Sequence, residues 1–536
     1  MLKVELIAYT KNPFDIAVAS ARTCYSSSLV KPHEVTDGQR ERVGALIYEA
    51  GHHTPFQHPT FVFGISGVSR HFVWSFLHSH PFYNSEQQSQ RYVYFDNSES
   101  FFVPPFESEG SSGRARVGLG STGAGALKYD GFKAANLYKN AFALAYEAYE
   151  RLSELLVEDN FRLMSKLGEI KGQDEKQVRT ESEKKAIENA RYVLPICAET
   201  TLYHTISAIT LQRYIRLVNA CDTPYEAKVV VDAMMGAVNK EDPILLKMIG
   251  ETPRMQKDTL EWGAVVAPLK TNGDDFAERF DKELGGRISK LVAYQGNGEI
   301  LLASAVRDVL GVGSSDLSDG EAIDLVMNPA KNPYHLDTLN SSVHSPLMRA
   351  LQHVSYTFKK RITHTADSQD QRHRMTPASK PLLSRVHTSR PDYHVPSVVE
   401  KNAEAEALYR KTCDMLWSVK DQLIDMGVSS EYAVYILPNA LNLRFTQSGN
   451  LLGFIHKWRL RTCFNAQKEI YDASMDEISQ VAEVHPRIAR YLGPPCMTRA
   501  LGGVHGDMKR EGPCPEGAHW CGIQVWKNFP KVRRPF

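Results

Sequence analysis

Gly51-His52-His53-Thr54-Pro55-Phe56-Gln57-His58, followed by Phe61-Val62-Phe63, is the stretch that decides the fold of the first half of the chain. A polar turn leads into alternating aromatic residues, which predicts a strand with one buried face. The apolar run from Val68 to Phe76 then predicts a helix in the core. Together these signals predict an α/β (α+β) fold in which a small sheet is combined with long helices.

An unusually polar run follows that helix. It reads Asn84-Ser85-Glu86-Gln87-Gln88-Ser89-Gln90-Arg91-Tyr92. Hydroxyl, amide and guanidinium groups placed so close together suit the carbonyl edges of a nucleobase and the oxygens of a phosphate. An ordinary polar surface loop is the alternative interpretation of the same residues.

Short strings from the first half recur in the same order in the second half, which indicates an internal duplication. We therefore expect a first domain over residues 1–275, a second over 285–500, and a cysteine-containing tail over 501–536. The turn formers Thr271-Asn272-Gly273-Asp274-Asp275 are the expected linker. The recurring strings are Leu6–Tyr9 with Leu291–Tyr294, Ser89–Tyr92 with Asp370–His373, and Leu194-Pro195 with Leu437-Pro438.

Composition narrows the class of protein. The formal net charge of +1 gives no global basis for binding a nucleic-acid backbone, so a nucleic acid is an unlikely partner. The N-terminal residues show no secretory signal, and no apolar run reaches the length of a membrane span. The eight cysteines are too sparse for a disulfide framework. We therefore expect a cytoplasmic protein with a small-molecule substrate.

The motifs resemble those of flavin-dependent thymidylate synthases. That family has a His-x-Thr/Ser-Pro-Phe-Glu-His strand start, an Arg-His-Arg helix end and Asn-Glu-x-Ser-x-Arg-Tyr. It also has Ala-Arg-x-Val-Leu-Pro before a long helix that ends in Leu-Arg, with Ala-Gln-x-Glu-Ile shortly after. The first half matches with residues 190–195, and the second with Leu460-Arg461 and residues 466–470. The resemblance covers most of both halves and implies two such domains in tandem.

The resemblance also implies an activity and an assembly. Members of the family bind FAD, reduce it with NADPH, and methylate dUMP to dTMP with methylenetetrahydrofolate. Each active site of their homotetramer is built from several subunits. A tandem chain would then need only two copies, a homodimer that forms a pseudo-tetramer. The alternatives are a related flavoenzyme acting on another pyrimidine nucleotide or an RNA uridine, and a non-catalytic nucleotide-binding homologue.

The two halves divide the arginines that this family uses for its substrate. The first half keeps Arg191 but has Val218 where the Leu-Arg arginine belongs, whereas the second keeps Arg461 but has Val434 in place of the Ala-Arg arginine. Combining the halves restores one set, so we expect one composite active site per chain. The opposite set, with Asp370, Val218 and Val434, should bind nucleotide poorly. Arg372 falls in that second set on this alignment and is expected to matter little.

The resemblance assigns roles to particular residues. The Arg-His-Arg motif is placed at Leu77-His78-Ser79-His80 and at Lys359-Lys360-Arg361. The expected catalytic residues are Ser89, Arg91 and Arg461. The expected substrate-binding residues are Glu86, Gln87, Ser89, Gln90, Arg91, Arg191, Lys360 and Arg461. The expected FAD-binding residues are His52, His53, Thr54, Gln57, His78, His80, Asn450 and His456.

The tail carries a separate signal. Cys496, Cys514 and Cys521, with His505 and His519 nearby, offer soft ligands for zinc among glycines and prolines. The spacing contains no paired Cys-x-x-Cys. Reduced cysteines packed as small hydrophobic residues are the alternative.

Overall fold

The structure is a computed structural model. It describes residues 2–106, 129–218, 223–249, 272–337, 339–507 and 511–535. Among these residues, no helix combines the length and the apolar character needed to cross a membrane.

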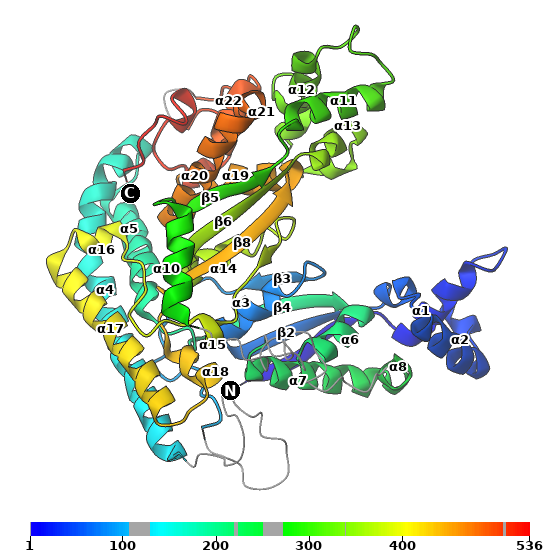
Figure 1. Cartoon of the computed structure of the whole chain (residues 1–536), viewed down its shortest axis with the longest axis horizontal. Helices are drawn as coiled ribbons and strands as arrows, with labels where there is room; N and C mark the ends of the chain where they lie inside the picture. Colours follow the sequence, from blue (N-terminus) through cyan, green and yellow to red (C-terminus); the bar gives the residue numbers. More distant parts are fainter. Residues whose placement is uncertain are drawn as a thin grey trace.

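Two four-stranded antiparallel sheets form the framework, one in each half of the chain (Figure 1). They have the same strand order, β1-β2-β4-β3 and β5-β6-β8-β7. The first sheet consists of β1 (Lys3–Tyr9), β2 (Thr60–Ser69), β3 (Asn84–Gln87) and β4 (Glu199–Ser207). The second consists of β5 (Ser289–Tyr294), β6 (Ser355–Thr363), β7 (Ala378–Ser379) and β8 (Asn442–Asn450).

The two edge strands β1 and β5 share an irregularity, which confirms the duplication. In β1 the pairing with β2 shifts between Leu6 and Ala8, and in β5 the pairing with β6 shifts between Leu291 and Ala293. The matched strings therefore fold in the same way, including the one residue that each strand leaves out of the ladder.

Helices surround both sheets. In the first half they are α1 (Pro13–Thr23), α2 (Asp37–Glu49), α3 (Arg70–His78), α4 (Gly131–Lys171), α5 (Glu175–Ala190), α6 (Ala208–Leu217), α7 (Tyr225–Glu241) and α8 (Pro243–Ile249). The longer helices of the second half are α10 (Gly273–Leu284), α11 (Gly298–Leu310), α12 (Asp319–Met327), α14 (His364–Asp370), α17 (Ala403–Asp425), α19 (Leu451–Arg461), α20 (Lys468–Val484) and α22 (Pro495–Leu501). Single-turn helices are α13 (Pro346–Arg349), α15 (Leu383–Val386), α16 (Ser397–Glu400), α18 (Ser430–Ala433) and α21 (Pro486–Ala489).

The predicted linker is wrong from Asn272 onward, because those residues begin α10. The side chain of Asn272 accepts hydrogen bonds from the backbone N–H groups of Asp274 and Asp275, at 2.9 and 3.2 Å. Asparagine is a favoured N-cap, and acidic residues in the first turn complement the helix dipole. The same turn formers thus start a helix; Thr271 lies outside the described residues.

The two halves face each other through their Leu-Pro motifs with twofold symmetry. The N–H of Ile196 donates to the carbonyl of Leu437, and the N–H of Asn439 donates to the carbonyl of Leu194, both at 2.8 Å. Pro195 and Pro438 form an antiparallel bridge between these bonds. Reciprocal contacts are the mark of a twofold axis, so the tandem domains pair within one chain as two subunits would in a dimer.

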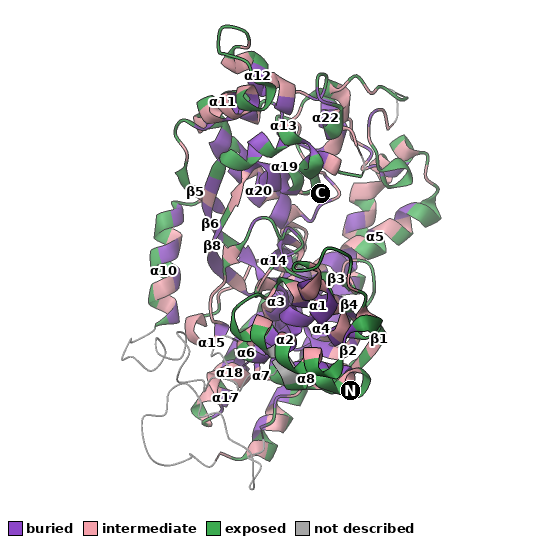
Figure 2. Cartoon of the chain, turned by 90° about the vertical axis from the view of Figure 1, so that its right-hand side faces the viewer, coloured by how far each residue is buried: buried purple, intermediate pink, exposed green. Residues whose placement is uncertain are grey.

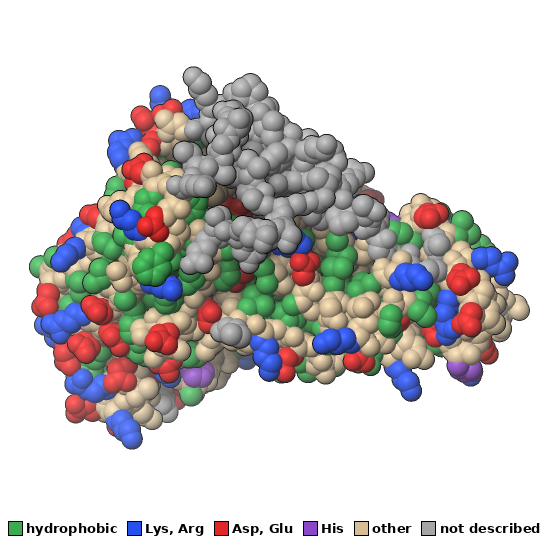
Figure 3. Space-filling view, turned by 90° about the horizontal axis from the view of Figure 1, so that it is seen from below, with side chains coloured by type: hydrophobic (Ala, Val, Ile, Leu, Met, Phe, Trp, Pro, Cys, Tyr) green, Lys and Arg blue, Asp and Glu red, His purple; other side chains and the backbone are tan. Residues whose placement is uncertain are grey.

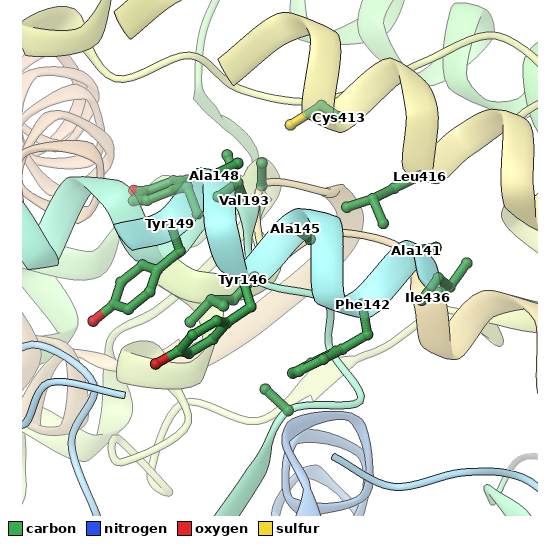
Figure 4. Close-up of a cluster of buried hydrophobic side chains, with 14 of the residues drawn as sticks. Ala141, Phe142, Ala145, Tyr146, Ala148, Tyr149, Val193, Cys413, Leu416 and Ile436 are labelled. Carbon is green, nitrogen blue, oxygen red and sulfur yellow. The ribbon is translucent and has the colours of Figure 1, made fainter. Parts of the chain in front are cut away.

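A shared hydrophobic core lies between α4 and α17. Figure 4 shows Cys413 and Leu416 of α17 near the α4 segment that carries Ala141 and Ala145, with Ile436 beside them. All five side chains are buried. Burying a leucine side chain contributes about 1.5–3 kcal/mol, so this seam stabilises the pairing of the halves. Figure 2 shows buried residues concentrated through the middle of the molecule, whereas α8 and α10 carry many exposed ones.

In each half, a buried glutamate accepts hydrogen bonds from the N-cap residue of the helix that follows the central strand. Ser69 donates its N–H to Glu226 at 2.7 Å, and Thr363 donates its N–H to Glu469 at 2.6 Å. These two hydroxyl residues are the N-caps of α3 and α14. The matching contacts show that α3 and α14 are equivalent, which fixes the alignment of the segments that follow them.

Candidate functional site

The polar run of the first half ends beside the second half. Arg91 donates from Nε to the carboxylate of Glu188 in α5 at 2.6 Å, and from Nη2 to the carbonyl of Asn465 at 2.9 Å. Burial alone would raise the pKa of Glu188, but the charges of Lys185 and Arg91 outweigh it and hold that pKa well below its usual range. Glu188 is therefore a charged anchor for Arg91.

Arg191 reaches the second half from the same side. Its Nη2 donates to Gln467 Oε1 at 2.6 Å and its Nε to the carbonyl of Glu188 at 3.2 Å. Burial lowers the pKa of Arg191 to about 10, which leaves the guanidinium charged at neutral pH.

Arg461, at the end of α19, completes the group. It donates from Nε to His373 Nε2 at 2.9 Å and from Nη2 to the carbonyl of Gln369 at 2.6 Å. Burial lowers its pKa to about 10; Asp370 opposes that shift, and the positive charges of Arg91 and Arg372 add to it. The halves therefore bring these arginines together within one chain. We call Arg91, Arg191, Arg372 and Arg461 the arginine cluster.

Strand pairing corrects the sequence alignment of the second half. Ser85 pairs with His204 in the first sheet, and Ala378 pairs with Gln447 in the second. His204 and Gln447 are equivalent, because they are separated by 243 residues (447 − 204), as are Pro195 and Pro438 (438 − 195). Residues after α3 therefore correspond to residues 293 positions later after α14 (378 − 85).

This offset locates the Arg-His-Arg motif. In this alignment, Arg372-His373-Arg374 of the second half is equivalent to Ser79-His80-Pro81 of the first. Both segments directly follow the helix, which is where the family has its Arg-His-Arg motif. The match of Ser89–Tyr92 with Asp370–His373 is therefore wrong, and so is the assignment of the motif to Lys359-Lys360-Arg361. The Arg-His-Arg string is present in the sequence. Because Gln371-Arg372 resembles Gln90-Arg91, the sequence alignment matched it instead with the loop that carries Arg91.

The relocated motif lies against the polar run of the first half. Arg372 Nη2 is 3.4 Å from the carboxylate of Glu86, and Arg374 Nη2 donates to Asn84 Oδ1 at 3.2 Å. Gln371 Nε2 donates to Gln87 Oε1 at 3.3 Å. Arg372 thus lies beside the polar run of the first half, a position that the sequence alignment had not given it.

Two other residues of the run help to shape the loop. The hydroxyl of Ser89 accepts the backbone N–H of Arg91 at 3.3 Å, and Gln90 Oε1 accepts from Asn439 Nδ2 at 3.4 Å. Both contacts orient the loop that carries Arg91 toward the axis between the halves.

Lys360 lies in a different place from the one expected. It is fully buried on β6, 2.7 Å from Glu477 and 3.3 Å from Asp370, with Lys457 bridging the same two carboxylates at 3.6 and 3.2 Å. Burial would raise the pKa of Asp370, but the two lysines hold it well below its usual range. The charge of Lys360 therefore stabilises an ion network inside the second half.

Several buried polar atoms near the arginine cluster have no hydrogen-bond partner among the described residues. Within the described part of the chain, Gln90 Nε2, Gln369 Oε1, Gln371 Oε1 and His373 Nδ1 have no hydrogen-bond partner. Buried polar groups are satisfied in more than about nine cases in ten, so four such atoms around the arginine cluster indicate a place for a polar ligand. They offer both donors and acceptors, as the edges of a pyrimidine or a flavin ring require.

The residues expected to bind FAD fall into separate groups. His52, His53, Thr54 and Gln57 lie at the turn before β2, with His53 Nε2 3.2 Å from the carbonyl of Tyr48. Among the described residues, no hydrogen bond or ion pair joins these four side chains to the arginine cluster. Asn450 caps α19 by accepting the N–H of Gly453 at 2.9 Å.

Of the histidines assigned to FAD, one lies at the composite site. The ring of His456 lies 5.7 Å from that of His373. His78 donates from Nδ1 to the carbonyl of Trp74 at 2.7 Å, and His80 Nδ1 accepts the N–H of Phe82 at 2.9 Å. Burial lowers the pKa of both His78 and His80 to about 4, so both are neutral.

The tail cysteines do not form a metal centre among the described residues, where no group of three or more His, Cys, Asp or Glu side chains could hold a metal ion. The zinc prediction is therefore unsupported. Cys496, Cys514 and Cys521 pack in a hydrophobic cluster with Trp520 and Trp526. Burial raises the pKa of the Cys514 thiol to about 11.

The tail contributes one residue beside the site that the sequence did not single out. Arg534 donates from Nη2 to the carbonyl of Ala466 at 2.6 Å and lies over the ring of Tyr471. Burial lowers its pKa, and the charges of Glu188 and Arg91 also act on it. The end of the chain thus reaches the same interface.

Comparisons with known proteins agree with the two halves. The family model described as "Thymidylate synthase complementing protein" matches residues 5–244 and 290–487. The flavin-dependent thymidylate synthase of Clostridium tetani is 29% identical over 252 residues, which cover 46% of this chain and 87% of that protein. The same-named protein of Geobacter sulfurreducens is 31% identical over 191 residues, 35% of this chain and 75% of that protein.

A solved structure is also similar. The UMP/dUMP methylase PolB from Streptomyces cacaoi, bound with 5-Br dUMP, aligns with a TM-score of 0.34 and 20% identity, over 48% of this chain and 97% of that one. Apart from the first residues of β1 and β5, each matched segment of the family model contains one of the four-stranded sheets described above. The chain therefore belongs to the thymidylate synthase complementing protein family and carries two copies of the family's domain in tandem.

Proposed function

We propose that this protein is a flavin-dependent enzyme that methylates dUMP to dTMP with methylenetetrahydrofolate and NADPH, at one composite site per chain. Membership of the family and the names of the matched relatives support the reaction. The observation that carries the proposal is the arginine cluster, which only the pairing of the two halves assembles.

The cluster suits a nucleotide monophosphate. Arginine forms paired, charge-assisted hydrogen bonds with phosphate oxygens, and it remains charged even when buried. Arg91 and Arg191 approach from the first half, and Arg461 approaches from the second. Glu188 offsets part of their mutual repulsion and keeps Arg91 extended toward the interface.

The orphaned polar atoms suit the uracil ring. His373 accepts the Arg461 Nε–H at its Nε2, so the neutral imidazole carries its proton on Nδ1. Burial, reinforced by the charge of Arg461, holds the pKa of His373 well below its usual value. Its Nδ1–H is then a donor for a carbonyl oxygen, and nearby guanidinium groups would stabilise negative charge that develops on the ring.

The flavin, when bound, supplies the hydride for the reaction. The residues present fit such a ring, because the unpartnered Oε1 atoms of Gln369 and Gln371 offer buried hydrogen-bond acceptors near the arginine cluster. From the resemblance to flavin-dependent thymidylate synthases, we assign His456 and Asn450 to flavin binding. The turn with His52, His53, Thr54 and Gln57 would complete the flavin site from a second copy of the chain.

A homodimer is part of the proposal. Ile7 and Tyr9 on β1 are 50% and 41% exposed, and Val292 and Tyr294 on β5 are 45% and 48% exposed. These large apolar side chains occupy matching positions in the two halves. Exposed apolar surface that recurs by symmetry is typical of an interface, so this strand face supports a pseudo-tetramer of two chains.

The test is a visible absorbance spectrum of the purified protein during titration with dUMP. A flavin spectrum that shifts on dUMP addition is expected, and the shift should be lost in Arg91→Ala. Arg361→Ala is the control, because Arg361 pairs with Asp281 on the outside of β6. A flavin spectrum that does not change when dUMP is added would indicate that the methyl acceptor is a molecule other than dUMP. Absence of flavin after FAD is added would refute it and favour a non-catalytic nucleotide-binding role.

A further inference from the structure

A cavity of about 230 Å³ lies between the two halves, away from the arginine cluster. Helix α3 forms one wall with Trp74 and His78, and the segment from Ala378 to Ser384 forms another. Leu217 and Val434 also line it. The cavity therefore lies, like the composite site, where both halves contribute side chains.

The cavity is the twofold mate of the arginine cluster. With the offsets fixed above, the segment Lys380–Ser384 corresponds to Gln87–Arg91, and Glu431 on the cavity wall corresponds to Glu188. The arginines are replaced by smaller residues. The counterparts of Arg91, Arg191, Arg372 and Arg461 are Ser384, Val434, Ser79 and Val218.

Small side chains stand where the arginine cluster has guanidinium groups, and three of the four counterparts line the cavity, which leaves volume open and changes the charge. Ser384, Val434 and Ser79 line the cavity and are uncharged. The cation that remains on the wall, Lys380, is bound to Asp367 at 2.6 Å and lies over the ring of Phe445. With Glu431 also on the wall, the described lining residues carry no net positive charge with which to hold a phosphate.

Polar atoms remain for an uncharged ligand. Within the described part of the chain, His71 Nδ1 and His78 Nε2 are buried without a hydrogen-bond partner, although His78 Nε2 lies 3.5 Å from Asp367 Oδ2. Burial lowers the pKa of His71 to about 3 and that of His78 to about 4, so both rings are neutral. Neutral His78 gives its Nδ1–H to the carbonyl of Trp74, so its Nε2 is an acceptor for a ring N–H, whereas His71 Nδ1, in the tautomer that protonates it, is a donor for a ring C=O; the pair matches the edges of a lactam ring.

Size limits the ligand further. The volume is below the roughly 300–1,000 Å³ typical of sites for drug-sized molecules, and a water occupies about 30 Å³. Trp74, Leu217 and Val434 provide apolar walls for a flat ring. We propose that this cavity is a second binding site, independent of the arginine cluster, for an uncharged single-ring heterocycle of the pyrimidine-base type.

The proposal is tested by calorimetric titration of the full-length protein with thymine and uracil, with and without saturating dUMP. We expect binding of at least one base, unchanged within twofold by dUMP. Ser384→Trp, which fills the cavity, should weaken base binding at least tenfold, whereas Ser384→Ala should leave it within threefold. Arg461→Ala should keep base binding and weaken that of dUMP, which separates this site from the composite one.

A second variant covers the case in which Ser384→Trp does not fold. Ser75→Phe fills the cavity from α3 and should have the same effect, with folding checked by circular dichroism. The proposal is overturned if neither base binds up to about 10 mM, a concentration that would reveal a millimolar Kd. It is also overturned if dUMP competes with the base or if Arg461→Ala abolishes base binding, because either result would place the base in the composite site.

Discussion

Replacing Arg461 by alanine is the sharpest test of the composite site, because Arg461 brings a guanidinium of the second half near Arg91 of the first. Its bonds to His373 and Gln369 use two of the five N–H donors of the guanidinium, so others remain for a phosphate. A hydrogen bond to a charged group contributes about 1.5–3 kcal/mol, so loss of one such bond should weaken dUMP binding roughly 10- to 150-fold. Calorimetry or the dUMP-dependent flavin spectrum measures the change.

Arg459→Ala is the matched control. Arg459 lies on the same helix, and burial likewise lowers its pKa, but its Nη2 contacts His335 Nδ1 at 2.8 Å and not the interface between the halves. It should leave dUMP affinity within twofold. If Arg461→Ala also stays within twofold while the protein remains folded, the assignment of Arg461 to the substrate is incorrect, and the composite site with it.

Three further predictions concern stability. Burial raises the pKa of Glu226 to about 8, so between pH 4.5 and 8 the folded chain keeps a proton that the unfolded chain loses. Stability should therefore fall as pH rises through that window, and Glu226→Gln should flatten the dependence in urea unfolding. Asp370→Asn leaves Lys360 and Lys457 with one carboxylate and should cost about 3–5 kcal/mol in the same assay. Leu416→Ala should cost about 2–5 kcal/mol, because it opens a cavity in the core between the halves.

The parts of the fold that the sequence predicts are those that local patterns specify. The alternation around Phe61 and Phe63 marks the central strand, which forms β2. The strings at Leu6 and Leu291 mark the two edge strands. The Leu-Pro motif occurs in both halves, and Pro195 and Pro438 pair with each other in an antiparallel bridge at the twofold axis, so both have the same backbone environment.

The second half's site could not be aligned from the sequence, because its marker strand is too short. β7 has two residues, Ala378 and Ser379, followed by Lys380-Pro381, whereas β3 has four. A proline removes a ladder hydrogen bond, so this strand lacks the alternation that marks its counterpart. The Arg-His-Arg string is present in the sequence, and the pairing of β7 with Gln447 of β8 establishes that Arg372-His373-Arg374 follows the helix as the family motif does.

The charged residues were hard to place for a different reason. Lys360 and Arg361 are neighbours on β6, yet one is fully buried and the other pairs with Asp281 on the outer side. Successive side chains of a strand point to opposite faces, so a basic run on a strand cannot form one binding surface. On the face seen in Figure 3, basic and acidic side chains are interspersed, so that view shows no broad basic surface for a nucleic acid either.

Joining two family domains in one chain explains why the two interface sites differ. In a homodimer every substitution appears at both symmetry-related sites, so an arginine cannot be lost from one and kept at the other. In this chain Arg91 and Ser384 occupy equivalent positions but are encoded separately. Close packing of four guanidinium groups is electrostatically costly and needs a carboxylate such as Glu188 to offset it. Separate encoding therefore allows one interface site to carry arginines while its twofold mate carries Ser384, Val434 and Ser79, which line the cavity beside Trp74.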